Sequence, residues 1–145
     1  EINMPKDLQQ KLIKERIYWL ITTRLDNDDV LARDTVEIIQ NKIQPQSVEN
    51  FTESMLFIEN SNLDFQGLTL WGEFLISYDK INGGVRFTLK DCPNGLSWTI
   101  TTGYPPERKK IVLHCTINRV QKPQEFIEEI NEFMDEWVTG IQNNF

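Results

Sequence analysis

The sequence predicts an α+β fold made of two N-terminal helices, a five-stranded, mainly antiparallel meander sheet and a C-terminal amphipathic helix packed on the sheet. Apolar residues recur every three or four positions before Pro45 and after Pro123, but at every second position between Met55 and Ile117. Glycine-containing turn sequences divide the alternating region into successive strands. Because 145 residues is close to the commonest domain size, we interpret residues 1–145 as a single α+β domain.

The first predicted helix covers residues 5–25. Asn3 and Pro5 suit the start of a helix, and Asp7 in the first turn complements the helix dipole. Six apolar residues then fall at helical spacing between polar ones: Leu8, Leu12, Ile13, Ile17, Leu20 and Ile21.

A second helix is predicted after Asn27, Asp28 and Asp29, each of which can act as its N-cap. It should end at Gln44, because Pro45 cannot continue the hydrogen-bonding pattern. The polar residues 45–54 are then expected to form a loop with room for one helical turn.

The first two strands are predicted at residues 55–58 and 68–78. The first is a short apolar run that ends before a polar turn sequence. In the second, side chains alternate between two faces. One face should carry Leu68, Leu70, Gly72, Phe74, Ile76 and Tyr78, and the other Thr69, Trp71, Glu73, Leu75 and Ser77.

The remaining three strands are predicted at residues 85–90, 96–101 and 110–117. Asn82-Gly83-Gly84 is a strong hairpin signal, because glycine adopts positive φ angles without steric cost. Residues 93–95 mark the next turn, and two prolines at 105–106 interrupt the ladder before the last strand. In that strand Ile111, Leu113, Cys115 and Ile117 should face the core.

The last helix should begin at Pro123 and bury one broad apolar stripe against the sheet. The stripe consists of Phe126, Ile127, Ile130, Phe133, Met134, Trp137, Val138 and Ile141.

The net charge of −7 is unevenly distributed. It amounts to −6 over residues 1–78, +5 over residues 79–124 and −6 over residues 125–145, where no base occurs. One interpretation is that the basic strands and the acidic segments neutralise each other within the protein. The other is that the local fields steer a partner of opposite charge.

One surface of the predicted sheet combines a tryptophan with charged and hydroxyl side chains. It would be either an ordinary solvated or helix-covered face, or a recognition surface anchored by the large Trp71. Its predicted members are Trp71, Glu73, Arg86, Lys90, Ser97, Thr99, Thr101 and His114.

The sequence contains no strong catalytic or metal motif, so we predict no catalytic residue, metal or cofactor. One histidine and two distant cysteines do not match a zinc site, and no glycine-rich loop leads from a strand into a helix. Cys92 and Cys115 are expected to be free thiols in a reducing cytoplasm. The apolar run at residues 17–21 is too short to cross a membrane.

These observations favour a non-enzymatic protein-binding domain, such as an adaptor, a chaperone or an inhibitor of the immunity-protein type. A basic protein partner would bind an acidic surface, whereas the overall negative charge argues against nucleic acid. An alternative is a small-ligand or lipid pocket between sheet and helices, and a weaker one is an enzyme using His114 with Glu73. The predicted partner-binding residues are Trp71, Glu125, Glu128, Glu129, Glu132, Asp135 and Glu136.

Overall fold

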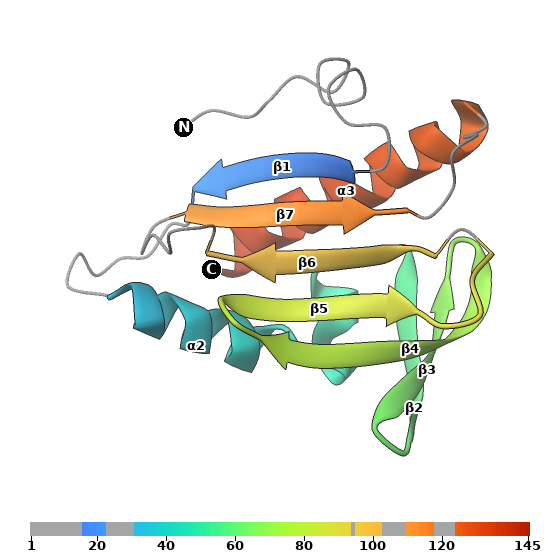
Figure 1. The fold of residues 1–145 in the computed structure, drawn as a ribbon, viewed down its shortest axis with the longest axis horizontal. Coiled ribbons are helices and arrows are strands. Elements are labelled where there is room, and N and C mark those ends of the chain that lie inside the picture. Colours follow the sequence, from blue (N-terminus) through green and yellow to red (C-terminus); the bar gives the residue numbers. More distant parts are fainter. Residues whose placement is uncertain (1–15, 23–30, 94, 103–109, 118–123) are drawn as a thin grey trace.

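The structure, a computed structural model, describes residues 16–22, 31–93, 95–102, 110–117 and 124–145. It has an α+β fold in which seven antiparallel strands form one sheet (Figure 1). In chain order the elements are β1 (Arg16–Thr22), α2 (Ala32–Lys42), the 3-10 helix η1 (Pro45–Asn50), β2 (Met55–Ser61), β3 (Asp64–Thr69), β4 (Gly72–Ile81), β5 (Gly84–Leu89), β6 (Ser97–Thr101), β7 (Lys110–Thr116) and α3 (Gln124–Asn144).

The strands lie in the order β1-β7-β6-β5-β4-β3-β2. From β2 to β7 each strand pairs with the next one in the chain, which is the predicted meander. The strand β1 breaks this order, because it pairs with β7 at the far edge, with Arg16 opposite Thr116. The antiparallel sheet and the C-terminal helix of the predicted fold are therefore confirmed.

The helix predicted over residues 5–25 is wrong for residues 16–22, which form β1. This segment is rich in β-branched and aromatic residues, which favour strands, although its apolar spacing also fits a helix. Residues 16–22 form a strand rather than a helix because the edge of β7 supplies hydrogen-bonding partners along the whole of β1. The other residues of that predicted helix lie outside the described part of the chain.

The second helix is confirmed, but it ends at Lys42 rather than at Gln44. The helix α2 begins after Leu31. The Leu31 N–H donates a hydrogen bond to Asp34 Oδ2 at 3.4 Å. The three residues predicted as N-caps, at 27–29, lie outside the described residues. The connector after α2 contains a 3-10 helix of six residues, η1, which is about two turns rather than the one expected. Proline occupies a position at its start, where the missing N–H has no cost.

The predicted strand over residues 68–78 is in fact two strands, β3 and β4, joined by a tight turn. The Thr69 hydroxyl stabilises this turn, because it accepts a hydrogen bond from the Trp71 N–H at 3.1 Å and donates one to the Gly72 carbonyl at 2.9 Å. Gly72 adopts a φ of 120°, which favours glycine. The hairpin adds a strand, and with β1 it accounts for the difference between five predicted strands and seven.

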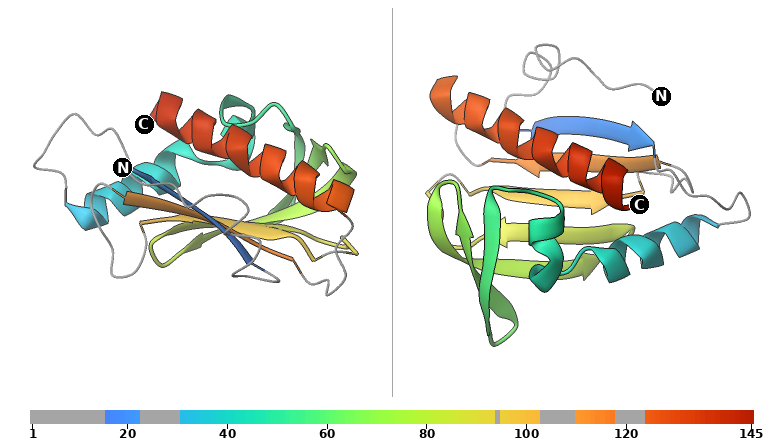
Figure 2. Two further views of the ribbon diagram at one scale, coloured as in Figure 1. Left: turned by 90° about the horizontal axis from the view of Figure 1, so that it is seen from above. Right: turned by 180° about the vertical axis from the view of Figure 1, so that it is seen from behind.

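The core lies between one face of the sheet and the helices. Figure 2 shows α3 and η1 on the same side of the strands, and Ile39 and Ile43 of α2 are buried in the same cluster. At its centre, Phe87 of β5 stacks on Trp98 of β6 at a ring distance of 5.3 Å, and Trp137 of α3 lies 5.7 Å from Phe87. The predicted core face of the last strand is confirmed, because its four members are buried: Ile111, Leu113, Cys115 and Ile117.

Candidate functional site

The helix α3 divides into an apolar face and an acidic one. Its buried residues include Phe126, Ile130, Phe133, Trp137 and Ile141, which pack on the sheet as predicted. The rest of the helix carries six acidic residues and no base. Burial of the apolar face therefore holds the carboxylates toward solvent on the opposite side.

Five of these acids form a continuous acidic stripe, which we define as Glu125, Glu128, Glu129, Glu132 and Asp135. Their spacing of three or four residues aligns them along the helix over about 15 Å. Three of them are exposed and two are half-buried. Glu128 accepts a hydrogen bond from the Gln124 side chain at 3.4 Å, a contact within the same helix.

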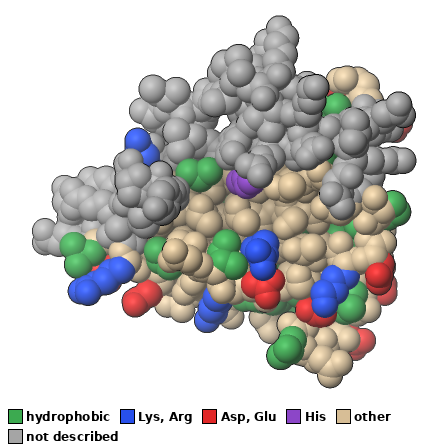
Figure 3. All heavy atoms as spheres, in the orientation of Figure 1, with side chains coloured by type: hydrophobic (Ala, Val, Ile, Leu, Met, Phe, Trp, Pro, Cys, Tyr) green, Lys and Arg blue, Asp and Glu red, His purple; other side chains and the backbone are tan. Residues whose placement is uncertain are grey.

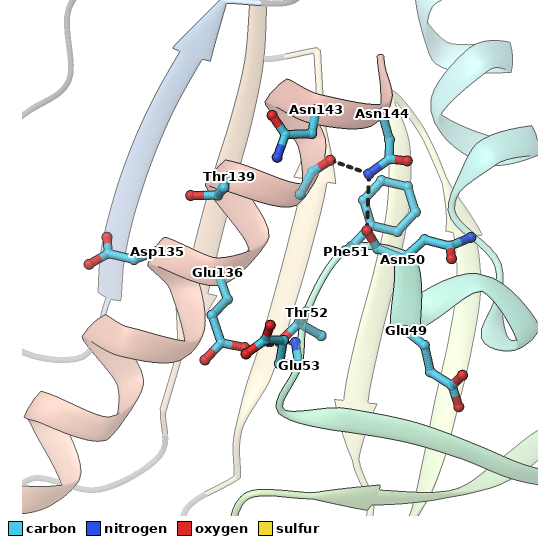
Figure 4. Close-up of a pocket in the computed structure, with 11 residues that line it drawn as sticks. Glu49, Asn50, Phe51, Thr52, Glu53, Asp135, Glu136, Thr139, Asn143 and Asn144 are labelled. Carbon is cyan, nitrogen blue, oxygen red and sulfur yellow. Dashed lines mark hydrogen bonds between the residues drawn. The ribbon is translucent and has the colours of Figure 1, made fainter.

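Glu136, the sixth acid, faces the loop that precedes β2 (Figure 4). Its Oε1 atom accepts hydrogen bonds from the Thr52 hydroxyl at 2.6 Å, from the Glu53 N–H at 2.9 Å and from the Ser54 N–H at 3.1 Å. The Ser54 hydroxyl donates to the same carboxylate. Bonds to an ionised acceptor are stronger than neutral ones, so Glu136 fastens the loop to α3.

A groove of about 510 Å³ runs between α3 and the segment of residues 49–53 (Figure 4). Asp135 lines the helix side of the groove, although Figure 4 shows its carboxylate pointing away from the opposite wall, where Glu49 and Glu53 lie. The walls are joined where the Asn144 side chain donates to the Asn50 carbonyl at 3.0 Å. The groove thus extends the negatively charged surface beyond the helix.

The close approach of the two groove walls depends on Gly140. A Cβ atom at this position would overlap the carbonyl oxygen of Phe51. The Phe51 ring stacks on Trp137 at 5.6 Å, which connects the floor of the groove to the aromatic core.

Trp71 does not lie on the polar face where we predicted it. The turn between β3 and β4 places its ring under α3, 5.2 Å from Phe133 and 5.9 Å from Phe126. It is half-buried and borders the first half of the helix that carries the acidic stripe. The structure therefore brings Trp71 and α3 together, although whether Trp71 contacts a partner remains a prediction.

The other predicted members of the polar face are confirmed on the sheet surface that no described helix covers. Arg86 lies opposite Thr99, and Thr99 lies opposite His114, in one row across three strands. Uncharged polar side chains and backbone, drawn in tan, make up most of the described part of this face in Figure 3.

Two bases of the middle segment are neutralised locally. Lys90 Nζ lies 2.7 Å from Asp64 Oδ2, and Arg86 lies 3.4 Å from Asp79. The hydrogen bond and the charge of Asp64 raise the pKa of Lys90. These pairs support internal neutralisation for part of the basic segment.

The structure does not bring His114 and Glu73 together. His114 is on β7 and Glu73 on β4, which are three strand spacings or about 14 Å apart. Along the strands, the row of His114 meets β4 at Asp79, about 20 Å from Glu73. A general acid and base acting on one substrate must lie much closer to each other.

Cys115 is buried on the face opposite His114, and its burial raises the pKa of its thiol. A buried thiol held in its neutral form is a poor nucleophile. Among the described residues, no group of three or more histidine, cysteine or acidic side chains could hold a metal ion. No helix among them is long and apolar enough to span a membrane.

No protein-family model matches the sequence, and no curated protein matches it significantly.

Proposed function

We propose that this protein is a non-enzymatic protein-binding domain that holds a basic partner on the acidic stripe of α3 and the adjoining groove. The observation that carries this proposal is the contrast between Glu136 and the four other glutamates of α3, Glu125, Glu128, Glu129 and Glu132. Glu136 has several hydrogen-bond donors and a role in the fold. The stripe lies outside the core and has no base on its own helix.

The stripe has a cost to the isolated protein. Like charges four residues apart on a helix repel by a few tenths of a kcal/mol per pair, and Glu125–Glu129 and Glu128–Glu132 are such pairs. The helix α3 packs on the sheet through its apolar face, so the acids of the stripe are not needed for this packing. A basic partner would relieve this repulsion and would be steered toward the stripe by the local field.

The class of partner follows from the charge. A protein surface rich in lysine or arginine fits the stripe and the groove, whereas the phosphates of a nucleic acid would be repelled. An adaptor, a chaperone or an inhibitor of the immunity-protein type would use such a surface to bind a basic protein. We keep this broad class as the proposal.

The small-ligand alternative needs an open pocket between the sheet and the helices. In the structure these rings pack against one another between sheet and α3, for example Trp98 against Phe133 at 5.0 Å and Trp71 against Phe133 at 5.2 Å. This packing favours a filled core over a ligand pocket at that position.

The test compares charge reversals on two helices. Glu128 is exposed on α3 and Glu37 is exposed on α2, so Glu128→Lys and Glu37→Lys change the net charge equally at different places. With an oligolysine peptide as the probe, titration calorimetry should show about two- to fivefold weaker binding for Glu128→Lys. Binding by Glu37→Lys should stay close to that of the wild type. If both variants bind oligolysine equally weakly, the effect depends on net charge and not on the acidic stripe, which would overturn the proposal.

A further inference from the structure

The large apolar side chains that remain exposed are concentrated on one hairpin. Of the six in the described residues, only Leu31 lies elsewhere. The other five belong to β2, β3 and the turns at the two ends of β3. We call them the apolar hairpin surface: Leu56 (48% exposed), Ile58 (46%), Leu63 (95%), Leu68 (42%) and Leu70 (38%).

The hairpin has a second apolar face that the fold already uses. Met55 and Phe65 are buried, and the ring of Phe57 lies 5.8 Å from that of Phe65. Leu56 and Leu68 lie opposite each other in the ladder, and both are exposed on the other side. A strand with one solvated face normally carries polar residues there, so packing within the fold does not explain these leucines.

The shape of the sheet makes this surface accessible. Figure 1 shows β2 and β3 running at a steep angle to β5 and β6, with the β2–β3 turn pointing away from the rest of the sheet. Asn62 in that turn has a φ of 57°, which permits the tight reversal, and the side chain of Leu63 beside it is almost fully exposed.

Two acids, Glu59 on β2 and Glu73 on β4, border the end of the apolar hairpin surface that carries Leu56 and Leu68. The sequence has no lysine or arginine between Lys42 and Lys80. Glu73 lies opposite Leu68 in the ladder, and Glu59 lies opposite Gln66. Both acids are exposed, and neither forms an ion pair with a described residue. At this end the surface is therefore apolar with an acidic border, whereas Lys80 and Lys90 line the pocket beside Leu63 at the other end.

This charge selects among the partners that could cover it. A second copy of the chain would bring the same acids together, and an anionic membrane would repel them. We propose that the apolar hairpin surface docks an amphipathic, basic segment of another protein, with apolar side chains against Leu56 and Leu68 and lysine or arginine beside Glu59 and Glu73. This inference rests on the proposed protein-binding function and adds a second contact to it.

The experiment uses a short peptide of alternating leucine and lysine as the probe, with serine–lysine and leucine–glutamate peptides of the same length for comparison. Leu56→Ser is matched by Leu31→Ser, because Leu31 is 50% exposed and lies outside the hairpin. We expect about fivefold weaker binding of the leucine–lysine peptide to Leu56→Ser and to Leu68→Ser, and no change with Leu31→Ser. The other two peptides should bind more weakly to the wild type. Thermal unfolding checks that each variant is folded.

The outcomes separate this inference from the proposed function. If the leucine–lysine peptide binds more weakly to Leu56→Ser but not to Glu128→Lys, the result would support the hairpin contact and count against the role of α3. Loss in Glu128→Lys alone would overturn the hairpin contact and leave the role of α3 intact. Equal binding of the leucine–glutamate peptide would overturn it too. Two other results would overturn the hairpin contact. One is a dimer, seen by sedimentation, that Leu56→Ser abolishes without changing peptide binding. The other is vesicle binding that Leu56→Ser abolishes without changing peptide binding.

Discussion

Glu136 on α3 accepts a hydrogen bond of 2.6 Å from the hydroxyl of Thr52, a residue far away in the sequence that lies just before β2. The same carboxylate oxygen also accepts the N–H groups of Glu53 and Ser54. This contact distinguishes Glu136 from the four glutamates of the acidic stripe. The hydrogen bonds to Glu136 stabilise the fold, so the acidic stripe is the candidate for partner binding.

Replacing Glu136 by alanine should lower the free energy of unfolding by about 2–3 kcal/mol, because several donors lose a charged acceptor. Glu132→Ala, at an exposed position of the same helix, should change it by less than about 0.5 kcal/mol. Urea denaturation measures both. Equal values for the two variants would show that the Glu136 contacts contribute nothing to folding.

Gly140→Ala should destabilise the protein by about 1–3 kcal/mol, because the new Cβ would overlap the carbonyl of Phe51. Helix propensity acts in the opposite direction by about 1 kcal/mol. Thr139→Ala, at the exposed neighbouring position, is the control and should be nearly neutral. A more stable Gly140→Ala variant would mean that α3 and η1 are not in close contact.

Tyr78 should make stability fall at alkaline pH. Burial raises its pKa from 10.0 to about 12, and its hydroxyl donates to the Ile43 carbonyl at 2.5 Å. Since the folded-state pKa is above the unfolded one, this contribution is complete below pH 10 and is lost as the pH rises toward 12.

Tyr78→Phe should therefore be less stable than the wild type near neutral pH, by about 1 kcal/mol for the lost hydrogen bond. Its stability should decline less steeply above pH 10, measured by urea denaturation at a series of pH values. Parallel profiles for the two proteins would contradict the assignment.

The two cysteines should differ in reactivity. Cys115 is buried and its thiol pKa is raised, whereas Cys92 is half-buried in the turn between β5 and β6. A thiol reagent should modify Cys92 first and Cys115 only after unfolding. In Cys92→Ser the fast phase should disappear. A fast phase that persists in this variant would show that Cys115 is accessible.

The parts of the fold that follow from local signals were predictable. Asn82-Gly83-Gly84 marks the β4–β5 hairpin, and the apolar stripe after Pro123 marks α3. The strand β1 could not be predicted, because its partner β7 lies about 90 residues further along the chain. The apolar residues of β1 also fit the spacing of a helix as well as that of a strand. The turn at Leu70 and Trp71 was also missed, since neither residue is a usual turn former.

The candidate site was predictable in its charge but not in its contacts. The six acids of α3 follow from the sequence, yet only the fold shows that Glu136 contacts Thr52 and that Trp71 lies under the helix. The apolar hairpin surface could not be predicted, because the alternating sequence places Leu68 and Leu70 on the same face of one long strand as Ile76, which is buried. In the structure Leu68 faces outward and Leu70 belongs to the turn.

The central claim is that the acidic stripe of α3 attracts a basic protein surface. It is tested most directly by the rate at which an oligolysine peptide associates with the wild type and with the Glu128→Lys/Glu132→Lys variant, at low and at physiological ionic strength. The account predicts that the wild-type rate is higher and falls as salt is added, and that the variant loses most of this advantage. Equal rates and equal salt dependence for the two proteins would contradict it.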